Sequence, residues 1–111
     1  MSGKDAGSVV WHLACNMDDI EEEDVLRCEL GGNVFAVYST PGGFYATDGL
    51  CTHEQANLAD GLVMGEHIEC PKHNARFHIP SGKATRRPAK IDLQTYPVKT
   101  EDGKVYIGLP A

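Results

Sequence analysis

Residues 51–73 read CTHEQANLADGLVMGEHIECPKH, and they decide how the rest of the chain has to be arranged. Two short loops frame the stretch, Cys51-Thr52-His53 and Cys70-Pro71-Lys72-His73, with sixteen residues between His53 and Cys70. Each loop offers one thiol and one imidazole. A single zinc ion accepts two Cys and two His, and a [2Fe–2S] cluster does so when two Cys bind one iron and two His bind the other. The ligand types alone leave both metals open.

The segment between the loops suggests how the four side chains can meet. Residues 61–65 and 67–69 have the composition of two short strands, and Gly65-Glu66 suits the turn between them. A hairpin returns its two ends to the same place. The sequence therefore predicts that both loops approach each other at one end of this hairpin.

The remainder of the chain consists of short β-like runs. Residues 25–30 and 34–39 face each other across Gly31-Gly32-Asn33, and the last two strand-like runs, 95–100 and 104–108, meet across Asp102-Gly103. Both connections favour tight hairpins, because Gly and Asn tolerate positive φ. The acidic residues 18–24 indicate a surface turn or one helical turn, and no segment beyond them has sustained helical periodicity. The pattern predicts an all-β chain of antiparallel strands, arranged as two small sheets or a barrel.

Length and composition narrow the class of protein. A chain of 111 residues with 41% hydrophobic residues is expected to form one domain with its own core. Its apolar runs are too short to span a membrane, and its first residues lack the features of a signal peptide. We therefore expect a cytoplasmic protein whose four Cys are ligands or free thiols rather than disulfides.

The net charge of −6 is unevenly distributed. Residues 1–69 hold thirteen acidic and two basic side chains, a balance of −11, whereas residues 70–111 have a balance of +5. Overall acidity argues against binding to nucleic acid, which requires a concentrated basic surface. The basic segment 86–90 is short, and a solvated loop explains it equally well.

The order of the ligands favours one of the two metals. Zinc fingers usually group like ligands, whereas each loop here mixes one Cys with one His. In a mixed loop the first residue can bind an inner iron and the second an outer one, which suits a dinuclear cluster. The pairing of C-x-H with C-x-x-H at the tip of a hairpin resembles the Rieske family, and in particular the Rieske-type ferredoxins of bacterial ring-hydroxylating oxygenase systems.

This resemblance implies a fold and a ligand set. It implies a single domain over residues 1–111, built as a Rieske-type antiparallel β-sandwich or barrel with a small cluster-binding subdomain at about 49–88. One [2Fe–2S] cluster is expected, with Cys51 and Cys70 on the inner iron and His53 and His73 on the outer iron. Pro88 resembles the proline of a loop that shields the cluster from water in this family.

Residues beside the ligands place the chain within the family. Rieske subunits of respiratory complexes have an additional disulfide between the two loops, and the corresponding positions here are Ala56 and Lys72. Those subunits also use a Ser and a Tyr to donate hydrogen bonds to sulfur, whereas Ala75 and Phe77 occupy the matching positions here. Without those donors we expect a reduction potential at the low end of the Rieske range, roughly −150 mV.

The function that the resemblance implies is electron transfer, with no catalytic residue in this chain. The protein is expected to act as a monomer that carries one electron from an NAD(P)H-dependent flavin reductase to a terminal oxygenase of aromatic hydrocarbon catabolism. The oxygenase itself is disfavoured, because its mononuclear iron needs two further His and a second domain. A respiratory subunit is disfavoured by the missing disulfide positions and membrane anchor. A small subunit of a reductase such as nitrite reductase, or a zinc-stabilised binding module, stays open.

The other Cys and His residues are expected to have no part in the metal site. Cys15 and Cys28 lie in strand-like runs and are expected to be buried thiols. His12, His67 and His78 lie in or beside predicted strands and are assigned no metal.

Overall fold

The computed structural model describes residues 9–52, 55–71, 75–87 and 89–110. These residues form short strands and two 3-10 turns: β1 (Val9–Asn16), η1 (Met17–Asp19), β2 (Asp24–Leu30), β3 (Asn33–Thr40), β4 (Gly43–Asp48), η2 (Leu58–Asp60), β5 (Leu62–Met64), β6 (His67–Glu69), β7 (Arg76–His78), β8 (Ala84–Arg86), β9 (Thr95–Tyr96), β10 (Val98–Glu101) and β11 (Lys104–Pro110). The predicted all-β class is confirmed.

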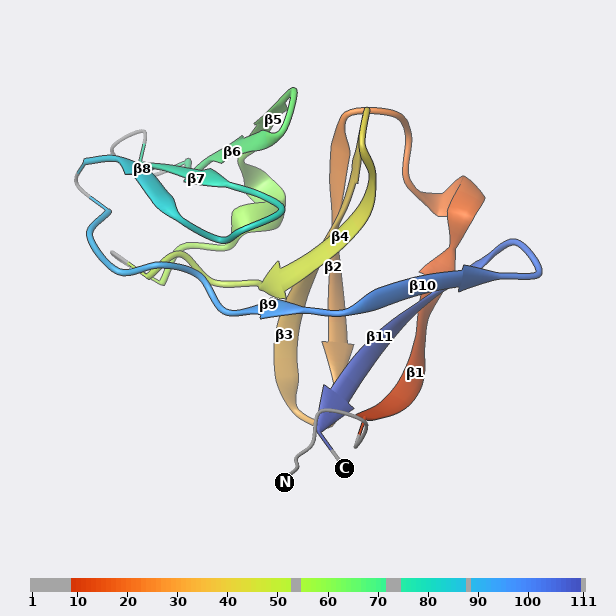
Figure 1. The fold of residues 1–111 in the computed structure, drawn as a ribbon. Coiled ribbons are helices and arrows are strands. Elements are labelled where there is room, and N and C mark those ends of the chain that lie inside the picture. Colours follow the sequence, from red (N-terminus) through yellow and green to blue (C-terminus); the bar gives the residue numbers. More distant parts are fainter. Residues whose placement is uncertain (1–8, 53–54, 72–74, 88, 111) are drawn as a thin grey trace.

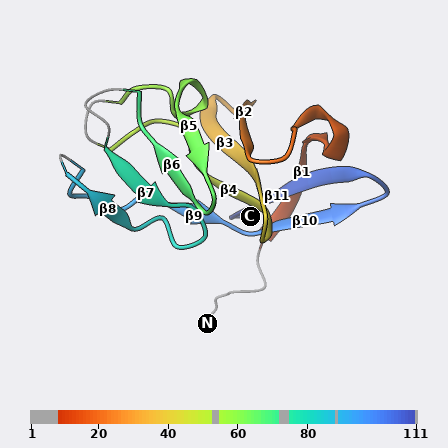
Figure 2. The ribbon, with the colours of Figure 1, turned by 90° about the horizontal axis from the view of Figure 1, so that it is seen from above.

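The strands pair into three antiparallel sheets (Figure 1). Two of them, ordered β1-β11-β10 and β2-β3-β4-β9, form the larger body, which also holds η1. The third sheet, ordered β5-β6-β7-β8, lies to one side of that body together with η2, as the view from above also shows (Figure 2). This third sheet covers residues 62–86, so it lies inside the predicted subdomain at 49–88, whose limits stay a prediction.

Strand β3 joins the two hydrophobic cores. Successive side chains of a strand point to opposite faces, and the residues of β3 follow this rule. Phe35 and Val37 pack into the core between the two larger sheets, whereas Ala36 and Tyr38 pack into the core beneath the third sheet. All four side chains are at most 3% exposed, so β3 contributes buried residues to both cores.

The predicted hairpin turns are present. Gly31 and Gly32 have φ of 58° and 83°, and Leu30 pairs with Asn33, so the turn has two residues and Asn33 already belongs to β3. Asp102 and Gly103 likewise have positive φ between β10 and β11. Positive φ at both central residues is the type I′ geometry, whose twist matches that of the flanking strands. The third predicted hairpin turns at Gly65, which has φ of 60°.

Two features differ from the sequence-based expectation. Strand β8 was not predicted, because Ala84-Thr85-Arg86 has no alternation of apolar and polar residues. The run 95–100, expected as one strand, is divided at Pro97 into β9 and β10, which belong to different sheets. Proline has no N–H to donate to a ladder, and here its carbonyl accepts from Gly108 N at 2.8 Å.

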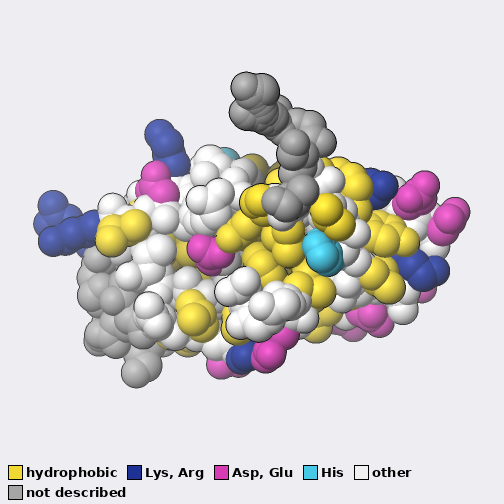
Figure 3. Space-filling view, turned by 90° about the horizontal axis from the view of Figure 1, so that it is seen from below, with side chains coloured by type: hydrophobic (Ala, Val, Ile, Leu, Met, Phe, Trp, Pro, Cys, Tyr) yellow, Lys and Arg dark blue, Asp and Glu magenta, His cyan; other side chains and the backbone are white. Residues whose placement is uncertain are grey.

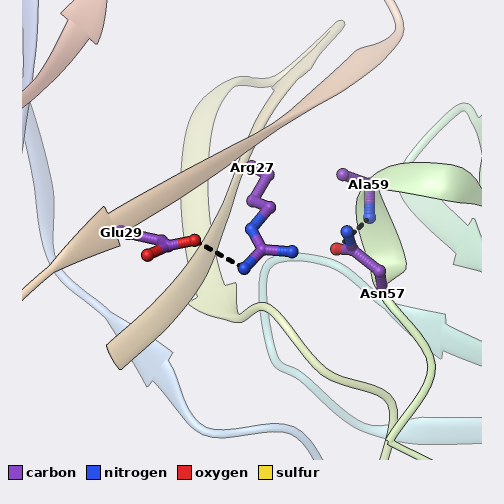
Figure 4. A network of polar contacts seen from close by, with 4 residues as sticks. All are labelled: Arg27, Glu29, Asn57 and Ala59. Atoms are coloured by element: carbon purple, nitrogen blue, oxygen red, sulfur yellow. Dashed lines mark hydrogen bonds and ion pairs between the residues drawn. The ribbon is translucent and has the colours of Figure 1, made fainter. Parts of the chain in front are cut away.

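Polar side chains lie where the two halves meet. Figure 4 shows Arg27 of β2 bound to Glu29 at 2.6 Å, with its guanidinium pointing toward the loop that holds Asn57. The Asn57 side chain caps η2 by accepting a hydrogen bond from Ala59 N at 3.3 Å. The cap fixes the loop that follows the first pair of predicted ligands.

The lower side of the molecule is apolar over part of its area. Figure 3 shows hydrophobic side chains gathered on this side, and β1 leaves Val10, Trp11 and Leu13 exposed at the surface. The Lys99 ammonium lies 5.0 Å from the centre of the Trp11 ring and 5.6 Å from that of Tyr106, a distance at which a cation is attracted to an aromatic face. Among the helices of the described residues, none is long and apolar enough to cross a membrane.

Candidate metal centre

Each of the two predicted ligand loops is closed by an equivalent backbone hydrogen bond. Cys51 N donates to Ala56 O at 2.8 Å, and Cys70 N donates to Ala75 O at 2.7 Å. In each loop a Cys therefore bonds to the carbonyl five residues further along the chain. His53 and His73 fall inside these loops by sequence, but both lie outside the described residues.

The first loop is held by two further backbone contacts. Gln55 N donates to Cys51 O at 2.7 Å, and Gln55 has a φ of 55°, a conformation that bends the chain sharply. Leu50 and Asn57 form an isolated antiparallel bridge immediately outside the loop. Both the backbone N–H and the backbone carbonyl of Cys51 are therefore hydrogen-bonded within the loop.

The second loop connects two paired strands. It begins after β6 ends at Glu69 and returns at Arg76, the first residue of β7, and these two residues face each other in the ladder. The Arg76 guanidinium contacts the Glu69 carboxylate at 3.1 Å, which adds an ion pair at the base of the loop. The β5–β6 hairpin and β7 thus place Cys70 at the end of the third sheet, as the sequence predicted.

Cys51 and Cys70 lie in one buried apolar cluster. Their exposed fractions are 0% and 1%, and Leu58, Ala75 and Phe77 belong to the same cluster, all with 0% exposure. Both cysteines are therefore buried in the same core, which the predicted approach of the two loops requires. A buried Cys is by itself an ordinary small hydrophobic residue. Two of them, on matching loops that each hold a His by sequence, are a candidate donor set for a metal centre.

The charge of the donor set fits the predicted cluster. Two Fe(III), two sulfides and two thiolates sum to zero, and neutral imidazoles add no charge, whereas four thiolates would leave −2. An uncompensated charge is expensive to bury among Leu, Ala and Phe side chains. The apolar surroundings of Cys51 and Cys70 therefore suit a centre with two Cys and two His better than one with four Cys.

The two residues that stand where respiratory Rieske subunits have a Ser and a Tyr are also buried. Ala75 and Phe77 both have 0% exposure beside the cysteines, and neither side chain has a hydrogen-bond donor. Ala56, at one of the positions of the additional disulfide in respiratory relatives, is half-buried against the same cluster. Lys72, at the other position, lies outside the described residues.

A segment far along the chain packs against the first loop. The Thr52 hydroxyl donates a hydrogen bond to Ile91 O at 2.6 Å, and Ala89 and Leu93 are buried in the cluster that holds the two cysteines. Pro88, the predicted shielding proline, lies outside the described residues next to this segment. No local signal in the sequence reveals this contact, because Thr52 and Ile91 are thirty-nine residues apart.

A cleft of about 420 Å³ lies beside the first loop, between it and β3. Asp48, Thr52, Gln55 and Tyr96 contribute to its lining. The Tyr96 hydroxyl donates to Asp48 Oδ1 at 2.6 Å, and burial together with this hydrogen bond raises the pKa of Tyr96. The wall of the cleft thus contains a hydrogen-bonded polar pair, and Cys51 belongs to it as the first residue of the ligand loop.

The remaining cysteines and histidines lie away from the loops. Cys15 and Cys28 are buried in the core between the two larger sheets, as predicted, and Cys28 Sγ contacts Ala14 O at 3.7 Å. Burial raises the pKa of Cys15 to about 11, so it is a protonated thiol at neutral pH. Among the described residues, no group of three or more His, Cys, Asp or Glu side chains could hold a metal ion.

Comparison with known proteins agrees with the predicted class. The profile of the Rieske [2Fe-2S] domain matches residues 10–97. The ferredoxin component of the naphthalene 1,2-dioxygenase system of Pseudomonas putida is 44% identical over 102 residues, which cover 92% of this chain and 98% of that protein.

Solved structures are similar over nearly the whole chain. The ferredoxin of Sphingomonas yanoikuyae B1 is 37% identical with a TM-score of 0.84, covering 89% of this chain and 98% of that one. A chain in the complex of reduced oxygenase and oxidized ferredoxin in carbazole 1,9a-dioxygenase is 33% identical with a TM-score of 0.81, covering 87% and 91%. By its match to the profile and its likeness to these relatives, the chain belongs to the Rieske [2Fe-2S] domain family.

Proposed function

We propose that this protein carries single electrons from an NAD(P)H-dependent flavin reductase to a terminal ring-hydroxylating oxygenase, as a monomer in the cytoplasm. The observation that carries the proposal is the pair of matching loops, each closed by a Cys N–H hydrogen bond and each placing its thiol in one buried apolar cluster. The similar proteins whose names describe ferredoxin components of dioxygenase systems support the same role.

The ligands that we assign are Cys51 and Cys70 on one iron and His53 and His73 on the other. When bound, the Rieske-type [2Fe–2S] cluster accepts and releases one electron at a time. The chain supplies two thiolates, so that the oxidised centre would have no net charge, and it surrounds them with apolar side chains. A nearly neutral oxidised centre accepts an electron more readily than one with four thiolates, and its potential is correspondingly higher.

The residues around the two cysteines influence the stability of the reduced state and therefore the reduction potential. Ala75 and Phe77 donate no hydrogen bond to sulfur from their side chains, so they leave the reduced state without that stabilisation. Ala89 and Leu93 are buried in the same cluster, and the Thr52 hydroxyl donates to the carbonyl of Ile91 between them, so this segment packs against the first loop. These contacts support a carrier at the low end of the Rieske range.

The partners and the location are part of the proposal. A single-domain electron carrier needs an electron donor and an acceptor, and a flavin reductase and an oxygenase supply both. The buried thiols Cys15 and Cys28 are compatible with the reducing cytoplasm. Light scattering of the holoprotein tests the monomer.

Reconstitution tests the function. The holoprotein is combined with a flavin reductase and a naphthalene-type ring-hydroxylating oxygenase, and NADH-driven product formation is measured with and without it. We expect turnover that depends on the holoprotein and is lost with Cys51→Ala. Failure with every ring-hydroxylating system, combined with activity in a nitrite-reducing system, would favour the reductase small subunit instead. A colourless protein with one zinc ion would contradict both.

A further inference from the structure

Two histidines face each other on the third sheet, away from the cysteine loops. His67 of β6 and His78 of β7 are paired directly across the antiparallel ladder, so their side chains lie on the same face of the sheet. Their ring centroids are 5.3 Å apart, with an angle of 64° between the ring planes. Both residues are half-buried, so solvent ions can reach the rings.

The separation of the rings matches that of two imidazoles on one metal ion. A zinc–nitrogen bond of about 2.05 Å and a distance of ~1.1 Å from nitrogen to ring centre place each centroid ~3.2 Å from the metal, and a tetrahedral angle then separates the centroids by ~5.2 Å. The observed 5.3 Å agrees with this value. The backbone pairing already holds both residues, so binding requires rotation of the rings but no change of the strands.

His78 also has the second contact that metal-binding histidines usually have. Its Nδ1 is hydrogen-bonded to Ser81 Oγ at 2.7 Å, which leaves Nε2 as the coordinating atom. The same hydroxyl oxygen accepts from Lys83 N at 3.3 Å. A hydroxyl oxygen has two lone pairs, so it can accept from both when Nδ1 carries the proton and Nε2 binds a metal.

The surroundings of His67 favour its uncharged ring. Burial lowers the pKa of His67, and His78 and Arg76 act in the same direction, while Glu66 opposes them. A neutral imidazole is the form that coordinates a metal ion. The Arg76 guanidinium is bound to Glu69 at 3.1 Å, which moderates its repulsion of an incoming cation.

We infer that His67 and His78 form a chelate for one divalent transition-metal ion, such as Zn²⁺ or Cu²⁺, with water in the remaining coordination positions. The site is separate from the [2Fe–2S] centre and does not depend on the proposed electron transfer. A bound ion would link β6 to β7, the two strands that hold the second cysteine loop at its base. Binding only to the folded chain would raise the thermal midpoint of unfolding.

Calorimetric titration of the oxidised holoprotein with Zn²⁺ tests the inference. Variants His67→Gln and His78→Gln remove one ligand each, Ser81→Ala removes the contact to His78, and His12→Gln on β1 is the matched control. Iron content and the visible spectrum of every sample verify that the cluster is intact. Copper electron paramagnetic resonance then counts the nitrogen ligands, since Cu²⁺ binds such sites more tightly than Zn²⁺.

We expect one ion per chain, two nitrogen ligands on Cu²⁺, and a higher thermal midpoint with Zn²⁺. Loss of either ligand should weaken binding by more than about tenfold. Ser81→Ala should weaken it by about tenfold, the lower end of the roughly 10- to 100-fold that removing such a supporting contact typically costs. His12→Gln should bind as the wild type does. No binding at millimolar Zn²⁺, unchanged affinity in both ligand variants, or release of iron with every bound Zn²⁺ would overturn the inference.

Discussion

Replacing Phe77 by Tyr tests how the buried residues around the cysteines set the reduction potential. Phe77 has 0% exposure, and it shares a cluster with Cys51 and Cys70. The new hydroxyl group would enter this apolar region, where sulfur is the acceptor that the proposed centre offers. A hydrogen bond to sulfur stabilises the reduced state more than the oxidised state, because the reduced centre holds one more negative charge. The potential should therefore rise.

The magnitude follows from the energy of one hydrogen bond. A net difference of about 1–1.5 kcal/mol between the two redox states corresponds to a rise of roughly 40–65 mV, since 1.4 kcal/mol equals about 59 mV for one electron. If the hydroxyl found no acceptor, burial would instead destabilise the fold by about 1–3 kcal/mol without a change in potential. The two outcomes are therefore separable.

The assay is a redox titration of the purified holoprotein, followed through its visible absorption. Phe44→Tyr is the matched control, because Phe44 packs against the other core, between the two larger sheets. We expect a higher potential in Phe77→Tyr and the wild-type potential in Phe44→Tyr. An intact cluster with an unchanged potential in Phe77→Tyr, or an equal rise in Phe44→Tyr, would refute the argument.

Three further changes test the ligands and the two cores. Cys51→Ala should abolish the visible absorption of the cluster, and an unchanged spectrum would contradict the ligand assignment. Tyr38→Phe removes a buried hydrogen bond of 2.8 Å to Thr47 Oγ1, while Thr47 keeps its bond to the Asp48 carbonyl; urea denaturation should show a loss of about 0.5–1.5 kcal/mol. The pKa of Cys15 is raised from 9.0 to about 11, chiefly by burial and then by the nearby Asp19 carboxylate. Between these two pH values the thiol keeps its proton in the folded state and loses it in the unfolded state. The free energy of unfolding should therefore fall as the pH rises from 9.0 to about 11, and less steeply in Cys15→Ala; equal slopes in denaturation curves would argue against this.

Local signals predicted the parts of the fold that local geometry determines. The Gly31-Gly32 and Asp102-Gly103 turns are present because both positions need positive φ, a requirement that can be read from the residues themselves. The continuous apolar run of β3 predicted a strand. It did not reveal that Phe35 faces one core and Tyr38 the other, because that depends on which sheets cover each face.

The parts that sequence analysis missed depend on contacts between distant residues. Strand β8 has no apolar pattern of its own, and the Asp92 side chain helps to hold it by accepting from Ala84 N at 2.9 Å. The bond from Thr52 to Ile91 joins segments whose proximity only the folded chain reveals. Within the site, burial of Cys51 and Cys70 in one cluster agrees with the predicted loops, while the assignment of all four ligands stays a prediction.

The potential of the holoprotein tests the central claim most directly. A redox titration monitored by electron paramagnetic resonance should give a single one-electron midpoint of roughly −150 mV, the low end of the Rieske range. This value would reflect two Cys and two His ligands without hydroxyl donors to sulfur. A midpoint near about −400 mV would indicate a cluster with four Cys ligands, and one well above zero would contradict the role assigned to Ala75 and Phe77.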